Sequence, residues 1–390
     1  MDDGHLRSQR ATLDGAKGEI MKRHEVLAVA ALAAASLCGA ALAGGPPTYR
    51  VIKLNVEPKS GDGNAEATAI AEGGGWWASG AWLSVQIATG EGTFRAVSCD
   101  RENLCTDPFP ELPTGGSATA VDINQLGEMI GVRQDPGQQP FGYAVLSGKA
   151  FTAFESLKYN CPEVKGFIPQ AVSNNRYIYG NAPGCHGHIR PAYYHKGNLR
   201  IASGMENALP PGAMTVRYVD VMKGASGGAV IFKDGHTEAF HTYWFSQGVH
   251  FLGTLGGPNS VTRAVRWSYA VGCSDTAIPG EQKAFWAGGP TEQPMTALPP
   301  FGDGPTCATG VTTKPVIVGN GQKSTQVQPS TAFYYRDGVM YDINDLLQES
   351  DRKYHILRIA GITGAGNIAA TAISDDDPHT VAVRLELVKE

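Results

Sequence analysis

The sequence predicts an all-β fold, a single seven-bladed β-propeller closed by its N-terminal strand. The first observation behind this prediction is a short sequence motif that recurs along the chain. It consists of an apolar residue, a polar Gly-rich turn, and a second apolar stretch that ends on a small residue eight positions after the apolar residue. Its copies are Ile70/Ala78, Ile123/Gly131, Val172/Gly180, Val221/Ala229, Ala264/Gly272, Val311/Gly319 and Ile362/Ala370. Successive small residues lie 53, 49, 49, 43, 47 and 51 positions apart. A regular period of this length indicates a repeat architecture.

The second observation is that each repeat reads as four short strands. A first strand such as 67–70 leads to a turn such as 124–127, where Gly or Asn can adopt positive φ. The second strand is apolar, and we predict it at 76–78, 129–131, 177–179 and 316–318. We attribute its small residue to crowding of inner strands around a central channel.

The third and fourth strands follow after a variable loop. The third combines Ala or Gly with aromatic residues, at 142–144, 192–194, 239–241, 284–286 and 332–335. The fourth is clearest at 249–253 and 339–343, and 342–347 is the one stretch that reads as a helical turn. Four short strands separated by turn signals are typical of antiparallel β structure, and units of this length match propeller blades.

The third observation concerns the two ends of the repeat region. Residues 49–54 read as a strand before the first repeat, and the last repeat ends at 380–387, which is its third strand. The N-terminal strand can therefore supply the missing fourth strand and leave no open sheet edge. We expect one propeller domain over 44–390, with no linker inside it.

Residues 1–43 read as an N-terminal extension and signal peptide. A basic segment at 21–24 precedes an apolar stretch at 26–42, and 41–43 form a small-x-small cleavage site before Gly44. The alternative is a membrane anchor, but about 17 apolar residues are at the short limit for a span. We expect a periplasmic or extracellular protein that is not inserted in a membrane after cleavage.

Charge and cysteine content narrow the class of protein further. The net charge is −5, which disfavours nucleic acid and anionic membranes as partners because both require clustered Lys and Arg. Of the seven cysteines, six remain after the predicted cleavage, and an even number in an exported chain indicates disulfides. Pairing each cysteine with its neighbour in the sequence keeps every disulfide within one repeat or between two adjacent repeats. We favour this pairing over free buried thiols: Cys99–Cys105, Cys161–Cys185 and Cys273–Cys307.

The repeats resemble the HAF-repeat family of probable extracellular repeat proteins. Residues 252–257 match the family's Leu-Gly-x-Leu-Gly-Gly element, 123–127 match its Ile-Asn-x-x-Gly turn, and 331–346 resemble its closing unit. The His of the family's His-Ala-Phe tripeptide is replaced here by Glu238, Lys283 or Thr331. The resemblance implies export and repeat structure, and it implies no established catalytic chemistry.

Three motifs suggest chemistry, and each has a simpler explanation. Residues 224–228 fit G-x-S-x-G around Ser226, but we expect an exposed inter-strand turn there and no nucleophile, because no helix pattern follows. Residues 185–188 contain Cys and two His, yet zinc needs further ligands at workable spacing. The acidic stretch 374–379 lacks the calcium-loop spacings and reads as a solvated hairpin loop. We therefore expect no metal and no cofactor.

The candidate binding residues are Trp76 and Trp77. Adjacent residues on one strand point to opposite faces, so one of the two is expected to be exposed unless both pack between blades. Exposed aromatic rings beside polar loops suit sugar or protein ligands. We predict an exported binding module for a protein or carbohydrate, with the ligand over the channel mouth or on the loop-rich face. The alternatives are a hydrolase or lyase acting on glycans, which needs convergent acid, base and cation in the channel, and an immunity-type protein neutralising a periplasmic toxin.

Overall fold

The computed structural model describes residues 45–56, 64–72, 81–89, 92–109, 111–146, 152–154, 166–183, 189–222, 225–242, 248–288, 293–323 and 331–389. The chain divides into two units, Met1–Pro47 with Glu390, and Thr48–Lys389. The described residues of the first unit, 45–47, contain no helix or strand. The expected signal peptide lies outside the described residues, and everything below concerns the second unit.

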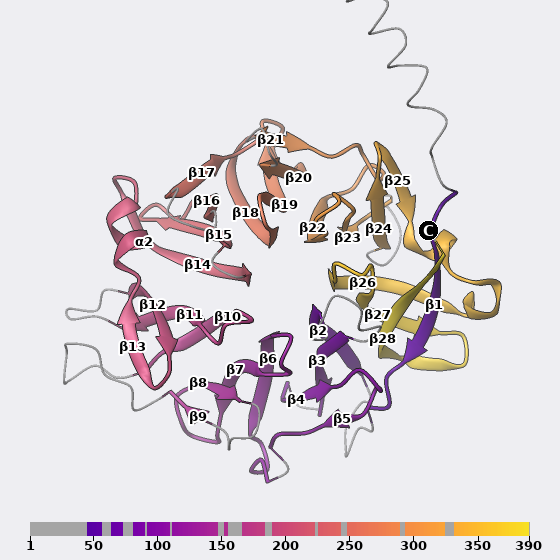
Figure 1. Ribbon diagram of the computed structural model, residues 1–390, viewed down its shortest axis with the longest axis horizontal. Helices are drawn as coiled ribbons and strands as arrows, with labels where there is room; N and C mark the ends of the chain where they lie inside the picture. The colour runs from indigo at the N-terminus through magenta and orange to yellow at the C-terminus, as the bar shows by residue number, and fades with distance from the viewer. Residues whose placement is uncertain are drawn as a thin grey trace, which may run out of the picture. The chain divides into compact units, whose positions relative to one another are not determined.

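The described part of the second unit is built from antiparallel β-sheets, in agreement with the all-β prediction (Figure 1). Five sheets have four strands each. They consist of β2 (Ala65–Glu72), β3 (Ala81–Ala88), β4 (Phe94–Cys99) and β5 (Cys105–Thr106); β6 (Ser117–Ile123), β7 (Met129–Gln134), β8 (Phe141–Val145) and β9 (Thr152–Ala153); β10 (Ile168–Val172), β11 (Ile178–Pro183), β12 (Ile189–His195) and β13 (Asn198–Ile201); β22 (Thr306–Val311), β23 (Ile317–Gly321), β24 (Thr331–Arg336) and β25 (Val339–Asp342); and β26 (Tyr354–Ile362), β27 (Ile368–Ser374), β28 (Asp377–Lys389) and β1 (Thr48–Lys53).

The sixth sheet of the described residues has eight strands and consists of two four-stranded halves. The halves are β14 (Ala213–Met222), β15 (Ala225–Phe232), β16 (Thr237–Thr242) and β17 (Val249–Gly253), and β18 (Gly256–Arg266), β19 (Tyr269–Thr276), β20 (Gln282–Gly288) and β21 (Gln293–Ala297). A parallel pairing of Thr237 with Asn259 joins β16 to β18. Figure 1 shows the sheets following one another in a ring, with β2, β6, β10, β14, β18, β22 and β26 nearest its middle.

Helical structure is scarce in the described residues. The η2 turn (Ile343–Leu346) agrees with the predicted helical stretch 342–347, and the Asp342 side chain accepts a hydrogen bond from the Asn344 N–H at its start. The α2 helix (Ser203–Ala208) and the η3 turn (Glu349–Asp351) were not predicted. In the part of the chain that the structure describes, no helix has the length and apolar character needed to cross a membrane.

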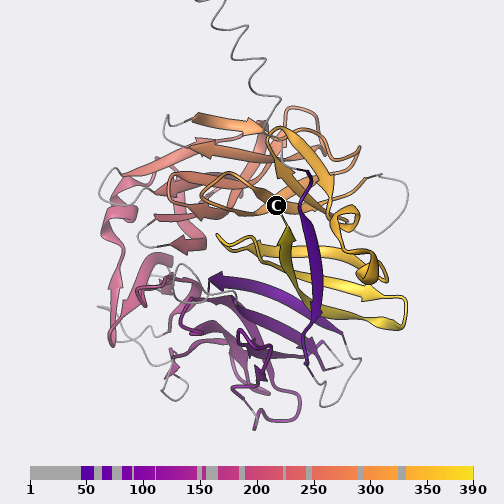
Figure 2. The same cartoon turned by 45° about the vertical axis from the view of Figure 1, so that its right-hand side comes forward.

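The N-terminal strand joins the last sheet, as the sequence predicted. Strand β1 pairs antiparallel with β28, and Val51 faces Leu385 in the register. Tyr49 and Val51 are buried at this junction, with 1% and 8% of their surface exposed. Figure 2 shows the indigo strand β1 running beside the yellow C-terminal strand. The sheet order β1-β28-β27-β26 therefore places β1 at the outer edge of the last sheet.

The first repeat departs from its predicted strand boundaries. Its second strand is β3, which begins at Ala81, and Ile70 pairs with Leu83. In the next repeat the corresponding pair is Ile123 with Met129. The second strand of this repeat, the one that pairs with β2, therefore begins later than the predicted strand at 76–78. Those residues themselves lie outside the described residues.

Small residues on the second strands have a more local cause than crowding around the channel. A Cβ added to Gly131 would lie 1.9 Å from the Thr119 carbonyl oxygen, on the neighbouring inner strand. The same clash with an inner-strand carbonyl oxygen occurs at 1.9–2.3 Å for Gly180, Gly228, Gly272 and Gly319. Each of these inner strands has a β-bulge at this point. The bulge brings the two backbones close together, and glycine accommodates that approach.

Two of the three predicted disulfides fall in the described residues, and both are present. Cys99–Cys105 joins β4 to β5, and Cys273–Cys307 joins β19 to β22. The third predicted pair, Cys161–Cys185, lies outside the described residues.

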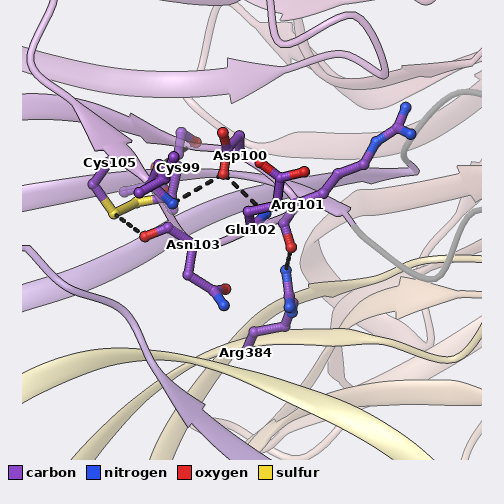
Figure 3. Close-up of a disulfide and its surroundings, with 10 residues drawn as sticks. Cys99, Asp100, Arg101, Glu102, Asn103, Cys105 and Arg384 are labelled. Carbon is purple, nitrogen blue, oxygen red and sulfur yellow. Dashed lines mark hydrogen bonds between the residues drawn. A yellow bond between two sulfur atoms is a disulfide. The ribbon is translucent and has the colours of Figure 1, made fainter.

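Figure 3 shows the turn that the first disulfide closes. The Asp100 carboxylate accepts backbone hydrogen bonds from Glu102 and Leu104, each at 2.9 Å. Arg384 on β28 donates to the Arg101 carbonyl oxygen at 3.0 Å. This contact links the first sheet to the last, which are far apart in the sequence.

Candidate binding cavity

The inner strands line an open cavity of about 800 Å³. Its walls come from β2, β6, β10, β14, β18, β22 and β26, with additions from residues that include Val132 and Asn320. Every four-stranded unit of the described residues therefore contributes to one shared space. A volume of this size is within the range of small-molecule sites, about 300–1,000 Å³.

A β-bulge in each inner strand determines which side chains line this cavity. At each bulge the register shifts by one residue, so one residue on the inner strand has no partner on the second strand. These unpaired residues are Thr68, Val121, Gln170, Val219, Arg263, Thr309 and Ala360, and all of them line the cavity. A bulge redirects a side chain, so the fold fixes seven positions and the sequence fills them with different chemistry.

One part of the cavity wall carries three arginines. Arg217 on β14, Arg263 on β18 and Arg358 on β26 all line the cavity and are exposed. Burial lowers the pKa of Arg263, and the charges of Arg217 and Arg358 lower this pKa further. Arg358 Nη1 lies 3.4 Å from Glu66 Oε2. Within the described residues, the side chains of Arg217 and Arg263 form no ion pair or hydrogen bond.

Another part of the wall carries two carboxyl groups and a fourth arginine. Burial raises the pKa of Asp122 to about 8, and the nearby charge of Asp220 adds to this effect. Burial also raises the pKa of Asp220, and Arg266 opposes the rise at both carboxyl groups. Asp122 and Asp220 follow the bulge by one residue, while Arg217 and Arg358 precede it by two. Arg217, Arg263 and Arg358 therefore lie at or before the bulges, whereas Asp122, Asp220 and Arg266 follow them.

The two carboxylates are held by hydrogen bonds to the next inner strand. Asp122 Oδ2 accepts from the Val172 N–H and Asp220 Oδ2 from the Val265 N–H, both at 2.8 Å. The other Asp122 oxygen accepts from the Ile123 N–H at 2.8 Å. Both oxygens of Asp122 thus already accept backbone hydrogen bonds, one from its own strand and one from the next, which disfavours a catalytic role, since a general acid or base must reach its substrate.

Other polar side chains make the same kind of inter-strand bond. The Gln170 side-chain oxygen accepts from the Tyr218 N–H at 3.0 Å, and Asn320 Oδ1 accepts from the Ile359 N–H at 2.6 Å. Thr371 Oγ1 accepts from the Ala67 N–H at 3.2 Å and connects the last sheet to the first. A recurring polar contact between neighbouring units therefore positions the inner strands around the cavity.

Ser226 lies on a strand, and its predicted position in an exposed turn was wrong. It belongs to β15, pairs with Val221 and Thr242, and is 6% exposed. Its hydroxyl lies 3.0 Å from Thr242 Oγ1. The strand continues to Phe232 and no helix follows it in the described residues. The glycines around Ser226 gave the appearance of a turn, but they belong to a strand at a close backbone contact.

The remaining candidates of the sequence do not gather into a site. Trp76, Trp77 and the stretch 185–188 lie outside the described residues. Within those residues, no three His, Cys, Asp or Glu side chains are placed to hold a metal ion. Burial lowers the pKa of His241 to about 4, with a contribution from His250. The acidic loop is a hairpin whose carboxylates meet surface cations, with Asp376 at 2.9 Å from Lys353.

The arginine group was missed because its members come from three different repeats. Arg217 and Arg358 each lie four positions before the first apolar residue of the recurring motif, which is Val221 in one repeat and Ile362 in the other. Arg263 stands one position before Ala264. Alignment of the repeats on that motif, followed by a search for charged residues at equal offsets, would have found Arg217 and Arg358 but not Arg263.

Comparison with known proteins concerns the fold alone. No family model matches the sequence, and no curated protein matches it. A Mycobacterium tuberculosis puromycin-hydrolyzing peptidase is similar in structure, with a TM-score of 0.52 and 12% identity over 88% of this chain and 56% of that one. The β-propeller domain of the Trilobed protease from Pyrococcus furiosus has a TM-score of 0.51 and 6% identity over 84% of this chain and 98% of that domain. The chain spans just over half the length of the peptidase. The described architecture is propeller-like.

Proposed function

We propose that this chain is an exported, seven-bladed β-propeller that binds a small ligand in its central cavity. The observation that carries the proposal is the cavity itself, to which every inner strand contributes a bulge residue. A scaffold that aims seven variable positions into one space is suited to recognition. The volume fits a small molecule or a short oligosaccharide better than a protein domain.

The blade number follows from counting the eight-stranded sheet as two blades. Its halves meet at a single parallel pair, whereas each half is an antiparallel four-stranded unit like the others. Contacts between the first and last sheets support a closed ring. The Leu54 N–H donates to the Ala382 carbonyl oxygen at 3.1 Å, and the Thr380 N–H to Asn64 Oδ1 at 2.9 Å.

Export to the periplasm or the extracellular space is supported by the cysteines. The disulfides Cys99–Cys105 and Cys273–Cys307 suit an oxidising compartment. The resemblance to HAF-repeat proteins implies the same location. We propose cleavage before Gly44, so N-terminal sequencing of the exported protein should begin at that residue.

Binding is favoured over catalysis because Asp122 and Asp220 in the cavity wall already serve as inter-strand acceptors. The peptidase and protease activities of the structurally similar proteins are therefore not transferred to this chain. Carbohydrate is the ligand class we favour among neutral molecules, since the cavity wall includes hydroxyl and amide groups such as Thr68 and Asn174.

A cavity-filling variant tests the proposal. Val121 lines the cavity and is 38% exposed, and Val339 on β25 is 46% exposed and not part of the cavity wall. A panel of mono- and oligosaccharides and acidic metabolites is screened by thermal shift against wild type, Val121→Trp and Val339→Trp. Compounds that stabilise wild type should stabilise Val339→Trp and fail with Val121→Trp. Equal stabilisation of both variants would locate the ligand elsewhere, and a panel without any binder would also count against the proposal.

A further inference from the structure

We infer that Arg217, Arg263 and Arg358 form an anion-binding subsite that takes the carboxylate or phosphate of a small acidic ligand. The inference rests on the proposed function, because it assigns one part of the same cavity. The three side chains come from β14, β18 and β26 and are exposed in the cavity wall. The charges of Arg217 and Arg358 both lower the pKa of Arg263, which places each of the two within electrostatic reach of Arg263.

The fold leaves this positive charge largely uncompensated. Elsewhere arginines meet carboxylates directly: Arg190 binds Glu206 through two hydrogen bonds at 2.7 and 2.6 Å, and Arg384 binds Glu386 at 2.6 Å. In the cavity, Arg358 approaches Glu66 at 3.4 Å, while the described residues provide no carboxylate for Arg217 or Arg263. Like charges held together destabilise the unliganded protein, and a bound anion would relieve that repulsion.

The chemistry of guanidinium selects the ligand group. Each guanidinium offers a planar set of N–H donors that matches the two oxygens of a carboxylate or the oxygens of a phosphate. Because the donors come from three strands, the anion would be held from several sides. Carboxylate and phosphate share this recognition, and the experiment below separates them.

The rest of the cavity limits the ligand to one acidic group. The space of about 800 Å³ is much larger than an inorganic ion. Asp122 and Asp220 lie on the other side of the bulges, where a second acidic group would face carboxyl groups instead of the three arginines. We therefore expect a ligand with one acidic end at the arginines and a neutral, hydroxyl-bearing body, such as an acidic sugar.

The test uses glucuronate, glucose 6-phosphate and glucose as probes in isothermal titration calorimetry. Wild type should bind one or both anions and not glucose, and the better anion identifies carboxylate or phosphate as the preferred group. Affinity should fall between about 50 mM and about 500 mM NaCl. Arg217→Gln and Arg263→Gln should each weaken binding about 10-fold or more, because each removes a charged donor. Arg200→Gln, on β13 and outside the cavity wall, is the matched control and should change nothing.

Two further readouts separate recognition from folding. Arg263→Gln should unfold at the same temperature as wild type or higher, because it removes repulsion in the unliganded protein. Glu66→Gln should strengthen anion binding several-fold, because it frees Arg358 from its carboxylate neighbour. Anion binding that is absent in wild type, or unchanged in an Arg217→Gln, Arg263→Gln double variant, would overturn the inference. If neutral ligands still bind and are blocked by Val121→Trp, the proposed function stands without this subsite.

Discussion

Asp122 illustrates how single residues determine both the cavity and its pH response. Its carboxylate accepts backbone hydrogen bonds from Ile123 on its own strand and Val172 on the next. Burial nevertheless raises its pKa to about 8, above the ordinary value of 3.8. The folded chain therefore holds this proton more tightly than the unfolded chain does. The free energy of unfolding should fall as the pH rises from about 4 to about 8.

Asp122→Asn should remove the part of this pH dependence that Asp122 supplies. The amide keeps an oxygen for the Val172 N–H, as Asn320 does for the Ile359 N–H in another unit. Urea unfolding at about pH 5 and about pH 8.5 measures the effect, with a smaller loss of stability in the variant than in wild type. An identical loss in both proteins would show that Asp122 does not titrate in this range. Asp220→Asn provides the comparison, since burial also raises the Asp220 pKa and Arg266 opposes the rise at both residues.

Ser226→Ala should have a small cost in stability and no effect on ligand binding. The hydroxyl is buried on β15 and contacts Thr242 Oγ1, so its loss should cost about 0.5–1.5 kcal/mol. Thr242 Oγ1 still accepts from the backbone N–H of residue 226. A fluorophosphonate reagent should label neither wild type nor the variant. Labelling of wild type that the substitution abolishes would reopen the question of an enzyme.

At the scale of elements, β1 should contribute strongly to stability. Deleting residues 44–56 removes the buried side chains Tyr49, Val51 and Leu54 and exposes the edge of β28. At about 1.5–3 kcal/mol for each buried apolar side chain, the loss should be several kcal/mol. Differential scanning calorimetry of the deletion variant against the mature chain measures it. Equal melting temperatures would mean that β1 is peripheral to the fold.

The two described disulfides should differ in their contribution because they close loops of different length. Cys273–Cys307 spans 34 residues and joins strands of successive sheets, whereas Cys99–Cys105 spans 6 within one sheet. Chain-entropy arguments give a cost of about 4 kcal/mol for losing the first and about 2 kcal/mol for the second. Paired Cys→Ser variants compared by chemical denaturation test this order, and a reversed order would contradict it.

Local sequence patterns predicted most strands but not the details that form the cavity. The third-strand and N-terminal-strand predictions succeeded because apolar alternation and turn residues are short-range signals, as at 332–335 in β24. In the first repeat the apolar pair Trp76 and Trp77 suggested the second strand, but the strand that pairs with β2 begins at Ala81. The α2 sequence, Ser203–Ala208, offers no apolar period from which to predict a helix. Bulges leave no clear signal in a single sequence. The arginine group could not be predicted either, because Arg217 and Arg263 are 46 positions apart and Arg263 and Arg358 are 95 positions apart.

At the scale of the whole molecule, the cavity depends on the joining of the first and last sheets. Strand β1 pairs with β28, and Arg384, which is 3% exposed, reaches from β28 to the Arg101 carbonyl oxygen of the first sheet. Leu54, Leu83 and Ala382 pack in one apolar cluster that spans both sheets. These contacts bring β26 and β2, which carry Arg358 and Glu66, together in the cavity wall.

The most direct measurement is a crystal structure of the mature chain grown with the tightest binder from the thermal-shift panel. The account predicts seven four-stranded blades, with β1 as the outer strand of the last, and ligand density inside the central cavity. An acidic ligand should have its carboxylate or phosphate against Arg217 and Arg263. Ligand density on the outer surface with the cavity empty would contradict the account, and so would a ring in which β1 is not paired with β28.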